Sequence, residues 1–286
     1  MAVAPIVIRA SAKQRRFLDS KADTVVYQGG ARAGKTWAGA LKALLLAQAY
    51  PRCRGMIVAP SYPMLKQAVV VELTALADAM GLLYTWQWNK ADNEITLPGG
   101  GRILLRTASN PGSLLGATLG WAVGDEVALW SRQAYEYLQG RLSDPQGPRQ
   151  VCFTFTPKGT AHWTYSHLSQ SRQGLEVIRA TNRDNPSLPE DYFERIDREL
   201  GVGSPIWRQG NRRSGWPRRM RRMLYWARLR PCDLRKPYTG LPSSPTVRCR
   251  FRFSSSSGEL NFRFIRSSCR SVILGHLPFG HRPIIC

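Results

Sequence analysis

Residues 24–36 read TVVYQGGARAGKT, and the last eight of these residues match the phosphate-binding pattern G-x-x-x-x-G-K-[ST] at every position. Glycines allow a tight turn that points backbone N–H groups at phosphate oxygens, and the N-terminus of the following helix adds partial positive charge. We therefore expect Lys35 to contact the β and γ phosphates of a nucleotide and the Thr36 hydroxyl to bind Mg²⁺. The residues expected to surround the phosphates are Gly29, Gly30, Ala31, Arg32, Ala33, Gly34, Lys35 and Thr36.

The sequence on either side of this loop has the order strand, loop, helix that confirms such a motif. Residues 24–28 are mostly β-branched or aromatic, and an Ala/Leu-rich segment runs from Lys35 to the helix-ending Pro51. The alternative is a glycine-rich turn before an ordinary helix, and the Lys-Thr pair in register argues against it. Arg32 adds a cation inside the loop, which could contact the γ-phosphate or point to solvent.

Strand-like and helix-like segments alternate through residue 200, which predicts an α/β fold with a mainly parallel sheet covered on both faces. Pro98 to Gly101 predicts a hairpin between its two neighbouring strands. We expect residues 1–200 to form one three-layer domain of the P-loop NTPase type. The expected strands are residues 55–59, 94–97, 102–106, 120–124 and 151–155, and the expected helices are residues 64–80 and 131–140.

Charge divides the chain into two parts. The 286 residues carry a formal charge of +22, which favours a polyanionic partner such as nucleic acid. Residues 1–200 hold 23 basic and 17 acidic side chains, whereas residues 201–286 hold 18 basic and 2 acidic side chains.

The six cysteines have no C-x-x-C spacing and no apolar run reaches 18 residues. We therefore expect no zinc site, no disulfide scaffold and no membrane span. These features fit a soluble protein of a reducing cytoplasm.

A pair of carboxylates, Asp125 and Glu126, follows the apolar segment LGWAVG. An NTPase needs one carboxylate to orient Mg²⁺ and another to accept a proton from the attacking water. Neighbouring residues of a strand point to opposite sides, so two such roles require the chain to leave the strand here, and Gly124 would ease that turn. A surface Asp-Glu turn is the alternative, and the preceding apolar run argues against it.

Two polar residues elsewhere are weaker candidates for the same site. Thr156 lies at the end of the strand-like segment QVCFTFTPKG, where a hydroxyl can hydrogen-bond the γ-phosphate or its water. Gln14 precedes the glycine loop, and an amide there can read the edge of adenine. Ordinary strand packing for the threonine and simple exposure for the glutamine remain open alternatives.

In this order the motifs resemble the large subunit of a tailed-phage or prophage terminase, the ATPase that packages double-stranded DNA into a procapsid. The likeness covers most of residues 8–209 and extends to the segments IVAPSYPML, FTFTPKGTAHW and TNRDNPSLPEDYFERI. By position it implies that Gln14 contacts adenine, Arg32 and Thr156 couple hydrolysis to movement, Asp125 serves Mg²⁺ and Glu126 is the catalytic base. It also implies ATP as substrate, a host cytoplasmic location, and assembly as a homo-oligomer with DNA, portal protein and terminase small subunit.

The tail from residue 201 onward departs from this resemblance. Such subunits usually continue into a nuclease domain that holds two metal ions on several carboxylates, yet after Gln209 only Asp233 and Glu259 are acidic. The Arg, Ser and Pro-rich tail is either a basic DNA-binding arm or the product of a changed reading frame, with the frame change favoured. We therefore expect a poorly ordered tail and no nuclease activity in this chain.

Two rival functions are consistent with parts of the sequence. A DNA-dependent ATPase of helicase type carries similar strand-end motifs, but it usually needs a second RecA-like domain, and residues 201–286 cannot supply one. A nonenzymatic, basic nucleic-acid-binding protein with a vestigial phosphate loop is the other alternative.

Overall fold

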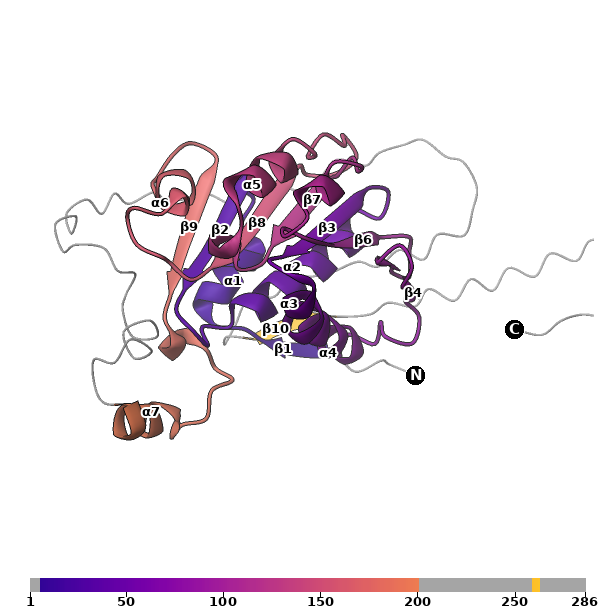
Figure 1. Ribbon diagram of the computed structural model, residues 1–286. Coiled ribbons are helices and arrows are strands. Elements are labelled where there is room, and N and C mark those ends of the chain that lie inside the picture. Colours follow the sequence, from indigo (N-terminus) through magenta and orange to yellow (C-terminus); the bar gives the residue numbers. More distant parts are fainter. Residues whose placement is uncertain (1–5, 201–258, 263–286) are drawn as a thin grey trace, which may run out of the picture.

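An eight-stranded sheet forms the centre of the molecule in a computed structural model, which describes residues 6–200 and 259–262 (Figure 1). The strands lie in the order β4-β5-β6-β3-β7-β8-β2-β9. The six strands from β6 to β9 in this order are mutually parallel, as the alternation of strands and helices predicts. In chain order the strands are β2 (Thr24–Gly29), β3 (Arg54–Ala59), β4 (Gln87–Asn89), β5 (Glu94–Thr96), β6 (Arg102–Thr107), β7 (Trp121–Gly124), β8 (Gln150–Phe155) and β9 (Leu175–Ala180).

The central strands read as nearly continuous apolar runs because both faces of the sheet are covered. Every residue of β2, β7 and β8 is buried. Strand β2 pairs with β8 on one side and with β9 on the other. All three therefore end at one edge of the sheet, where the loop after β2 begins.

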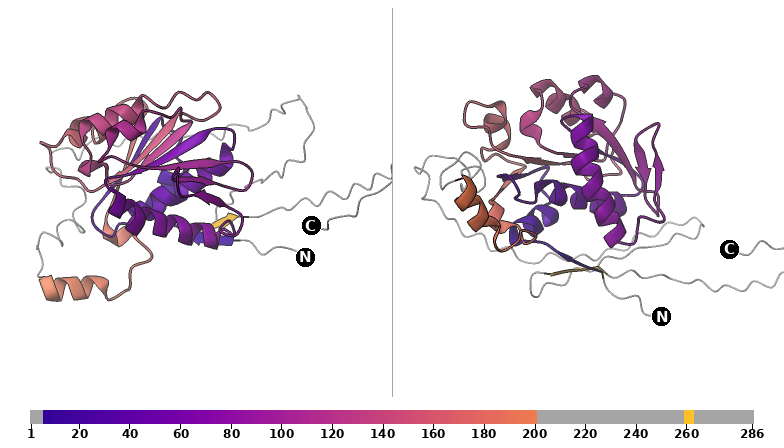
Figure 2. Two further views of the ribbon diagram at one scale, coloured as in Figure 1. Left: turned by 45° about the vertical axis from the view of Figure 1, so that its right-hand side comes forward. Right: turned by 60° about the horizontal axis from the view of Figure 1, so that its bottom comes forward.

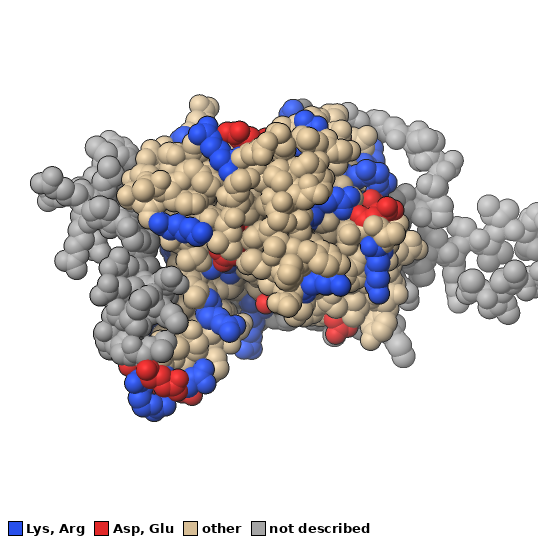
Figure 3. All heavy atoms as spheres, in the orientation of Figure 1, with Lys and Arg blue, Asp and Glu red and all other residues tan. Residues whose placement is uncertain are grey.

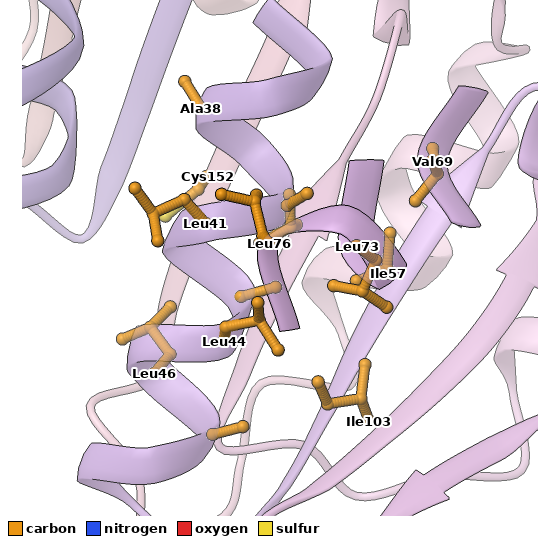
Figure 4. Close-up of a cluster of buried hydrophobic side chains, with 14 of the residues drawn as sticks. Ala38, Leu41, Leu44, Leu46, Ile57, Val69, Leu73, Leu76, Ile103 and Cys152 are labelled. Carbon is orange, nitrogen blue, oxygen red and sulfur yellow. The ribbon is translucent and has the colours of Figure 1, made fainter. Parts of the chain in front are cut away.

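One face of the sheet is covered by α1 (Ala12–Asp19), α2 (Lys35–Ala49) and α4 (Val71–Ala79) (Figures 1 and 2). Figure 4 shows the packing of this layer, in which Leu41 and Leu44 of α2 meet Leu73 and Leu76 of α4 beside Ile57 of the sheet. The Leu side chains shown there are at most 7% exposed. Burial of this kind is worth about 1.5–3 kcal/mol for each large aliphatic side chain, so α2 is firmly fixed beneath the loop that precedes it.

The opposite face is covered by α5 (Arg132–Gln139), α6 (Trp163–Leu168) and two short 3₁₀ helices, η2 (Pro111–Leu114) and η3 (Val127–Leu129). An aromatic group joins this layer to the sheet. The ring of Phe153 in β8 contacts the rings of Trp130 and Tyr135, and Tyr135 in turn contacts Trp163. The segment that follows β7 is therefore held against the end of β8.

The remaining segments complete the sheet and its surroundings. The hairpin expected around Pro98 to Gly101 is present as antiparallel β5 and β6, and β4 extends it to the edge. The helix expected over residues 64–80 is divided into α3 (Tyr62–Met64), a π-helical segment η1 (Leu65–Val70) and α4. The short strands β1 (Ile6–Arg9) and β10 (Glu259–Phe262) pair separately. After η4 (Asn182–Asp184), α7 (Tyr192–Leu200) stands apart from the layers in Figure 1.

Charge on the described surface agrees with the modest basic excess of residues 1–200. Figure 3 shows Lys and Arg side chains spread over the described part of this face, with Asp and Glu side chains among them. Apart from β10, the basic tail from residue 201 onward lies outside the described residues. Among the described residues no helix is long and apolar enough to cross a membrane.

Candidate nucleotide-binding site

The glycine loop joins the end of β2 to the start of α2, as its sequence predicts. Two of its residues have left-handed backbone, Arg32 with φ 62° and Gly34 with φ 72°. Glycine adopts this conformation freely, whereas arginine adopts it at a cost. The first glycine of the motif is needed for a different reason, since a Cβ atom on Gly29 would lie 2.9 Å from Cβ of Ala33 and 3.2 Å from the carbonyl oxygen of Ala180.

Lys35 is buried and its ammonium group faces the acidic residues after β7. Its Nζ donates to the carbonyl oxygen of Gly30 at 2.9 Å and lies 3.1 Å from Oε1 of Glu126. Glu126 is half-buried, so this ion pair is shielded from water more than a surface pair would be. The structure therefore brings together the phosphate-binding lysine and the expected catalytic base.

Asp125 is buried between the loop and the sheet. Its carboxylate accepts from the Thr154 hydroxyl at 2.6 Å and from the Thr36 hydroxyl at 3.2 and 3.3 Å. Burial is the main cause that raises the pKa of Asp125 to about 6, and the negative charge of Glu126 adds to it, while the bond from Thr154 and the nearby Lys35 work in the opposite direction. Asp125 is thus a carboxylate held in place by hydroxyl groups, with its ionised form disfavoured by burial.

Glu126 makes the turn that sends the two carboxylates in different directions. Its φ of 43° is left-handed, and its carboxylate accepts from the backbone N–H of Thr156 at 3.1 Å and from the Thr156 hydroxyl at 3.4 Å. The chain therefore leaves the strand at the carboxylate pair, as the sequence predicts, but the left-handed residue is Glu126, and Gly124 ends β7. Gly124 serves packing, because a Cβ atom there would lie 2.7 Å from the rings of Phe153 and Trp130.

The indole of Trp130 fixes this turn from the other side. Its Nε1 donates to the carbonyl oxygen of Asp125 at 3.0 Å, within the buried aromatic group. The backbone N–H of Asp125 donates to the carbonyl oxygen of Val58 in β3 at 2.8 Å. Both backbone polar groups of Asp125 are therefore satisfied, which holds its side chain toward Thr36.

Gln14 lies against the glycine loop in a nearly inaccessible position, 2% exposed. Its Oε1 accepts from the N–H of Ser11 at 2.8 Å, within the capping box that begins α1, and its Nε2 donates to the carbonyl oxygen of Gly34 at 3.4 Å. Gln14 is thus part of the support of the loop. That it also contacts adenine remains a prediction.

The tyrosine before the loop and an asparagine far along the chain also hold its backbone. The buried Tyr27 hydroxyl donates to the carbonyl oxygen of Ala33 at 3.2 Å, and Nδ2 of Asn185 donates to that of Arg32 at 2.8 Å. Sequence reasoning gave neither residue a role. Asn185 belongs to the NPSLP segment, which carried part of the family resemblance but no local signal of a contact 153 residues away.

The residues around Thr36 suit Mg²⁺ chemically. The hydroxyl of Thr36 and the carboxylate of Asp125 are oxygen ligands of the kind that Mg²⁺ prefers, and they already lie within hydrogen-bond distance of each other. In residues 6–200 and 259–262 no group of three or more His, Cys, Asp or Glu could hold a metal ion.

Comparison with known families identifies the chain. Residues 21–205 match the family model for the phage terminase large subunit, which is more than half of the sequence. The chain belongs to the phage terminase large-subunit family. The match begins before the glycine loop and ends beyond α7, so it includes the loop and both carboxylates. No curated protein matches the chain.

Solved structures of terminase large subunits share this fold. The large terminase of a thermophilic bacteriophage, in complex with ATP-gamma-S, is 22% identical with a TM-score of 0.60, over 70% of this chain and 51% of that chain. The large terminase ATPase domain of Thermus phage P74-26 is 23% identical with a TM-score of 0.55, over 71% of this chain and 97% of that domain. The present chain thus spans about half the length of the first of these two proteins.

Proposed function

We propose that this terminase subunit hydrolyses ATP and is the motor that moves double-stranded DNA into a procapsid. The observation that carries the proposal is the junction of loop and acidic turn, where Lys35 lies 3.1 Å from Glu126 and Thr36 lies 3.2 Å from Asp125. A phosphate chain bound in the loop would thereby have the lysine, the magnesium ligands and a general base within reach. The family membership of residues 21–205 supports the same assignment.

ATP binding in this proposal begins with an exchange of partners at Lys35. Its Nζ leaves the carbonyl oxygen of Gly30 and the carboxylate of Glu126 and contacts the β and γ phosphates. Backbone N–H groups of residues 30–36 bind the remaining phosphate oxygens at the start of α2. Thr36 and Asp125 would hold Mg²⁺, which would neutralise charge on the β and γ phosphates during transfer.

Glu126, released from Lys35, acts as the general base in hydrolysis. It accepts a proton from a water molecule whose oxygen bonds to the γ-phosphorus while the bond to the bridging oxygen breaks, giving ADP and phosphate. Thr156 keeps one Glu126 oxygen in place through its backbone N–H at 3.1 Å. Because Thr156 directly follows β8, a change at Glu126 would be transmitted to that strand, consistent with its proposed coupling role.

The partners of the motor follow from the family. We propose that the subunit works in the host cytoplasm as a homo-oligomer on the portal protein, receives DNA from the terminase small subunit and translocates double-stranded DNA. Arg32 then serves in coupling, and Gln14 contacts adenine. Assays of ATP turnover with and without linear DNA would test the coupling, and turnover that ignores DNA would contradict it.

Glu126→Gln tests the catalytic assignment most directly. The substitution keeps the shape of the side chain and one acceptor oxygen for the Thr156 N–H, but it replaces the other oxygen with an NH2 group and cannot accept the proton. Turnover should therefore fall about 10²–10⁴-fold with nucleotide binding retained. Glu136→Gln, at an exposed carboxylate on α5, is the matched control and should leave turnover unchanged. Equal turnover in wild type and Glu126→Gln would contradict the assignment of Glu126 as the general base, whereas wild-type protein without any ATP turnover would favour a nonenzymatic DNA-binding role.

We also propose that the 286-residue chain has no nuclease activity, because only two acidic residues follow Gln209 and a two-metal nuclease needs several. Purified protein should leave supercoiled plasmid intact in Mg²⁺ or Mn²⁺ over hours, as judged on agarose gels. Cleavage that depends on either metal would contradict this proposal.

A further inference from the structure

Four carbonyl groups of the glycine loop are engaged by side chains. The carbonyl oxygen of Gly30 accepts from Lys35, that of Ala33 from Tyr27 and that of Gly34 from Gln14. The fourth, that of Arg32, accepts from Nδ2 of Asn185 at 2.8 Å. A carbonyl oxygen facing a phosphate would repel it, so before a nucleotide binds these four bonds hold the loop in the orientation in which its N–H groups can face the ligand. The bonds from Tyr27, Gln14 and Asn185 can persist when Lys35 turns to the phosphates.

The hydrogen bond to the Arg32 carbonyl differs from the other three in how far its donor lies along the chain and in the backbone strain of the residue that it binds. Tyr27, Lys35 and Gln14 lie within 20 residues of the carbonyl groups that they bind, whereas Asn185 follows β9 and comes from 153 residues farther along the chain. Arg32 is also a non-glycine residue with left-handed backbone, at φ 62°. Such a conformation costs roughly 1–2 kcal/mol and persists only where the surroundings hold it.

Asn185 is itself fixed before it reaches the loop. Its Oδ1 accepts from the backbone N–H of Ser187 at 3.1 Å, and the preceding turn is closed by Asp184, whose carboxylate accepts from the N–H and the hydroxyl of Thr181. The oxygen and the nitrogen of the Asn185 amide therefore bind different segments. The oxygen holds its own turn and the nitrogen holds the glycine loop.

We infer that Asn185 is a positioning residue for nucleotide binding, which holds Arg32 in its left-handed conformation through the Arg32 carbonyl. The inference rests on the proposed binding of ATP by the glycine loop. It also ties the segment that leads from β9 into α7 to the nucleotide site, because the bond spans the two. A nucleotide that shifts Arg32 would also shift the turn before α7, through the hydrogen bond from Asn185 to the Arg32 carbonyl oxygen.

The chemistry of the amide offers a selective test in the full-length chain. Asn185→Asp keeps the oxygen that accepts from Ser187 but lacks the N–H that donates to Arg32, whereas Asn185→Ala lacks both. Ser187→Asp is the matched control for added charge, since it brings a carboxylate close by while leaving both Asn185 bonds possible. The probe is ADP carrying a fluorescent methylanthraniloyl group, with ATP turnover measured alongside.

Loss of one such hydrogen bond should weaken binding of the labelled ADP about 5- to 10-fold in both Asn185 variants and less than about 2-fold in Ser187→Asp. The KM for ATP should rise by a similar factor while kcat changes less, because Asn185 does not contact the reacting atoms. Arg32→Gly provides a second check. Glycine holds the left-handed conformation without help, so Asn185→Asp in that background should weaken binding less than about 3-fold.

Hydrogen exchange separates this inference from the proposed function. Without nucleotide, peptides covering residues 28–37 should exchange faster in Asn185→Asp than in wild type, while peptides from β8 should not change. Unchanged exchange and unchanged ADP affinity in Asn185→Asp would overturn the positioning role. Wild-type protein that binds no nucleotide, but whose loop exchanges faster in Asn185→Asp, would instead overturn the proposed ATP site and leave a structural brace in its place.

Discussion

The two sides of the nucleotide site use different parts of the chain, backbone groups on one side and side chains on the other. On the loop side, residues 29–34 offer backbone groups, shaped by the left-handed residues Arg32 and Gly34 and by side chains that bind their carbonyls. On the acidic side, the ends of β7 and β8 offer side chains, with Asp125 held by Thr154 and Glu126 held by Thr156. The loop side therefore depends on backbone conformation and the acidic side on the exact position of protons and charges.

Because of this difference, a substitution should affect different properties on the two sides. A change on the loop side should alter stability and nucleotide affinity through strain, even if no charge is lost. A change on the acidic side should alter turnover or the response to pH, even if the shape is kept. The Lys35 side chain spans both sides, so a change there should have the largest effect.

Lys35→Met should have the largest effect, because Lys35 bridges the Gly30 carbonyl and the Glu126 carboxylate. We expect kcat/KM for ATP to fall about 10²–10³-fold, the usual cost of removing one preorganised charged contact to the transition state. Lys42→Met is the matched control on the same helix, since Lys42 is also buried but binds the carbonyl oxygens of Leu18 and Ser20. Similar turnover losses per folded molecule in both variants would contradict the separation.

Asp125→Asn should change the response of stability to pH on the acidic side. The native pKa of about 6 lies above the ordinary value of 3.8, so the native state binds the proton more tightly than the unfolded state. The free energy of unfolding should therefore fall by about 3 kcal/mol as pH rises from about 4 to about 6, and then level off. Urea unfolding in metal-free buffer should show this slope in wild type and its absence in Asp125→Asn.

The control for the pH measurement is Asp78→Asn, which removes an exposed carboxylate and should keep the wild-type slope. If Asp125→Asn retains that slope as well, the proton is bound elsewhere. The prediction would then fail even if the variant is inactive.

Gly34→Ala should have the smallest of the three effects and act on the loop side. Its φ of 72° strains any L-residue, and a Cβ atom would also press on the amide of Gln14, which is buried and hydrogen-bonded at both ends. We expect a loss of about 2 kcal/mol in the free energy of unfolding, measured by urea. Gly81→Ala, at φ 67° with no atom within 4 Å of the added Cβ, isolates the backbone strain and should cost about 1 kcal/mol.

Much of the acidic side and the loop could be predicted because their signals are local. The glycine pattern, the strand before it and the paired carboxylates each occupy a short run of sequence, and parallel strands bring their ends to one edge. The alternation of segments likewise predicted the parallel sheet, and the glycine run predicted the antiparallel hairpin. The prediction of an α/β fold with a mainly parallel sheet is confirmed, whereas the predicted domain of residues 1–200 stays a prediction.

The remainder could not be predicted because it depends on contacts between distant segments. Asn185 binds the loop from 153 residues away, and nothing in its own neighbourhood indicates that partner. The positive φ at Glu126 had no local signal, because the glycine expected to ease the turn, Gly124, is needed instead to leave space for the Phe153 and Trp130 rings. β9 and β4 were missed for a related reason, since their partly exposed sequences lack the apolar signal of a central strand.

The ion pair between Lys35 and Glu126 gives the resting site a form of ligand discrimination. With its lysine already matched by a carboxylate at 3.1 Å, the buried part of the site presents no unbalanced lysine charge to passing anions. A ligand that brings only negative charge captures the lysine but leaves Glu126 without a counter-ion. A nucleotide bound to a divalent cation brings an opposite charge for both Lys35 and Glu126. The site should therefore favour metal-bound ATP over free nucleotide or inorganic phosphate.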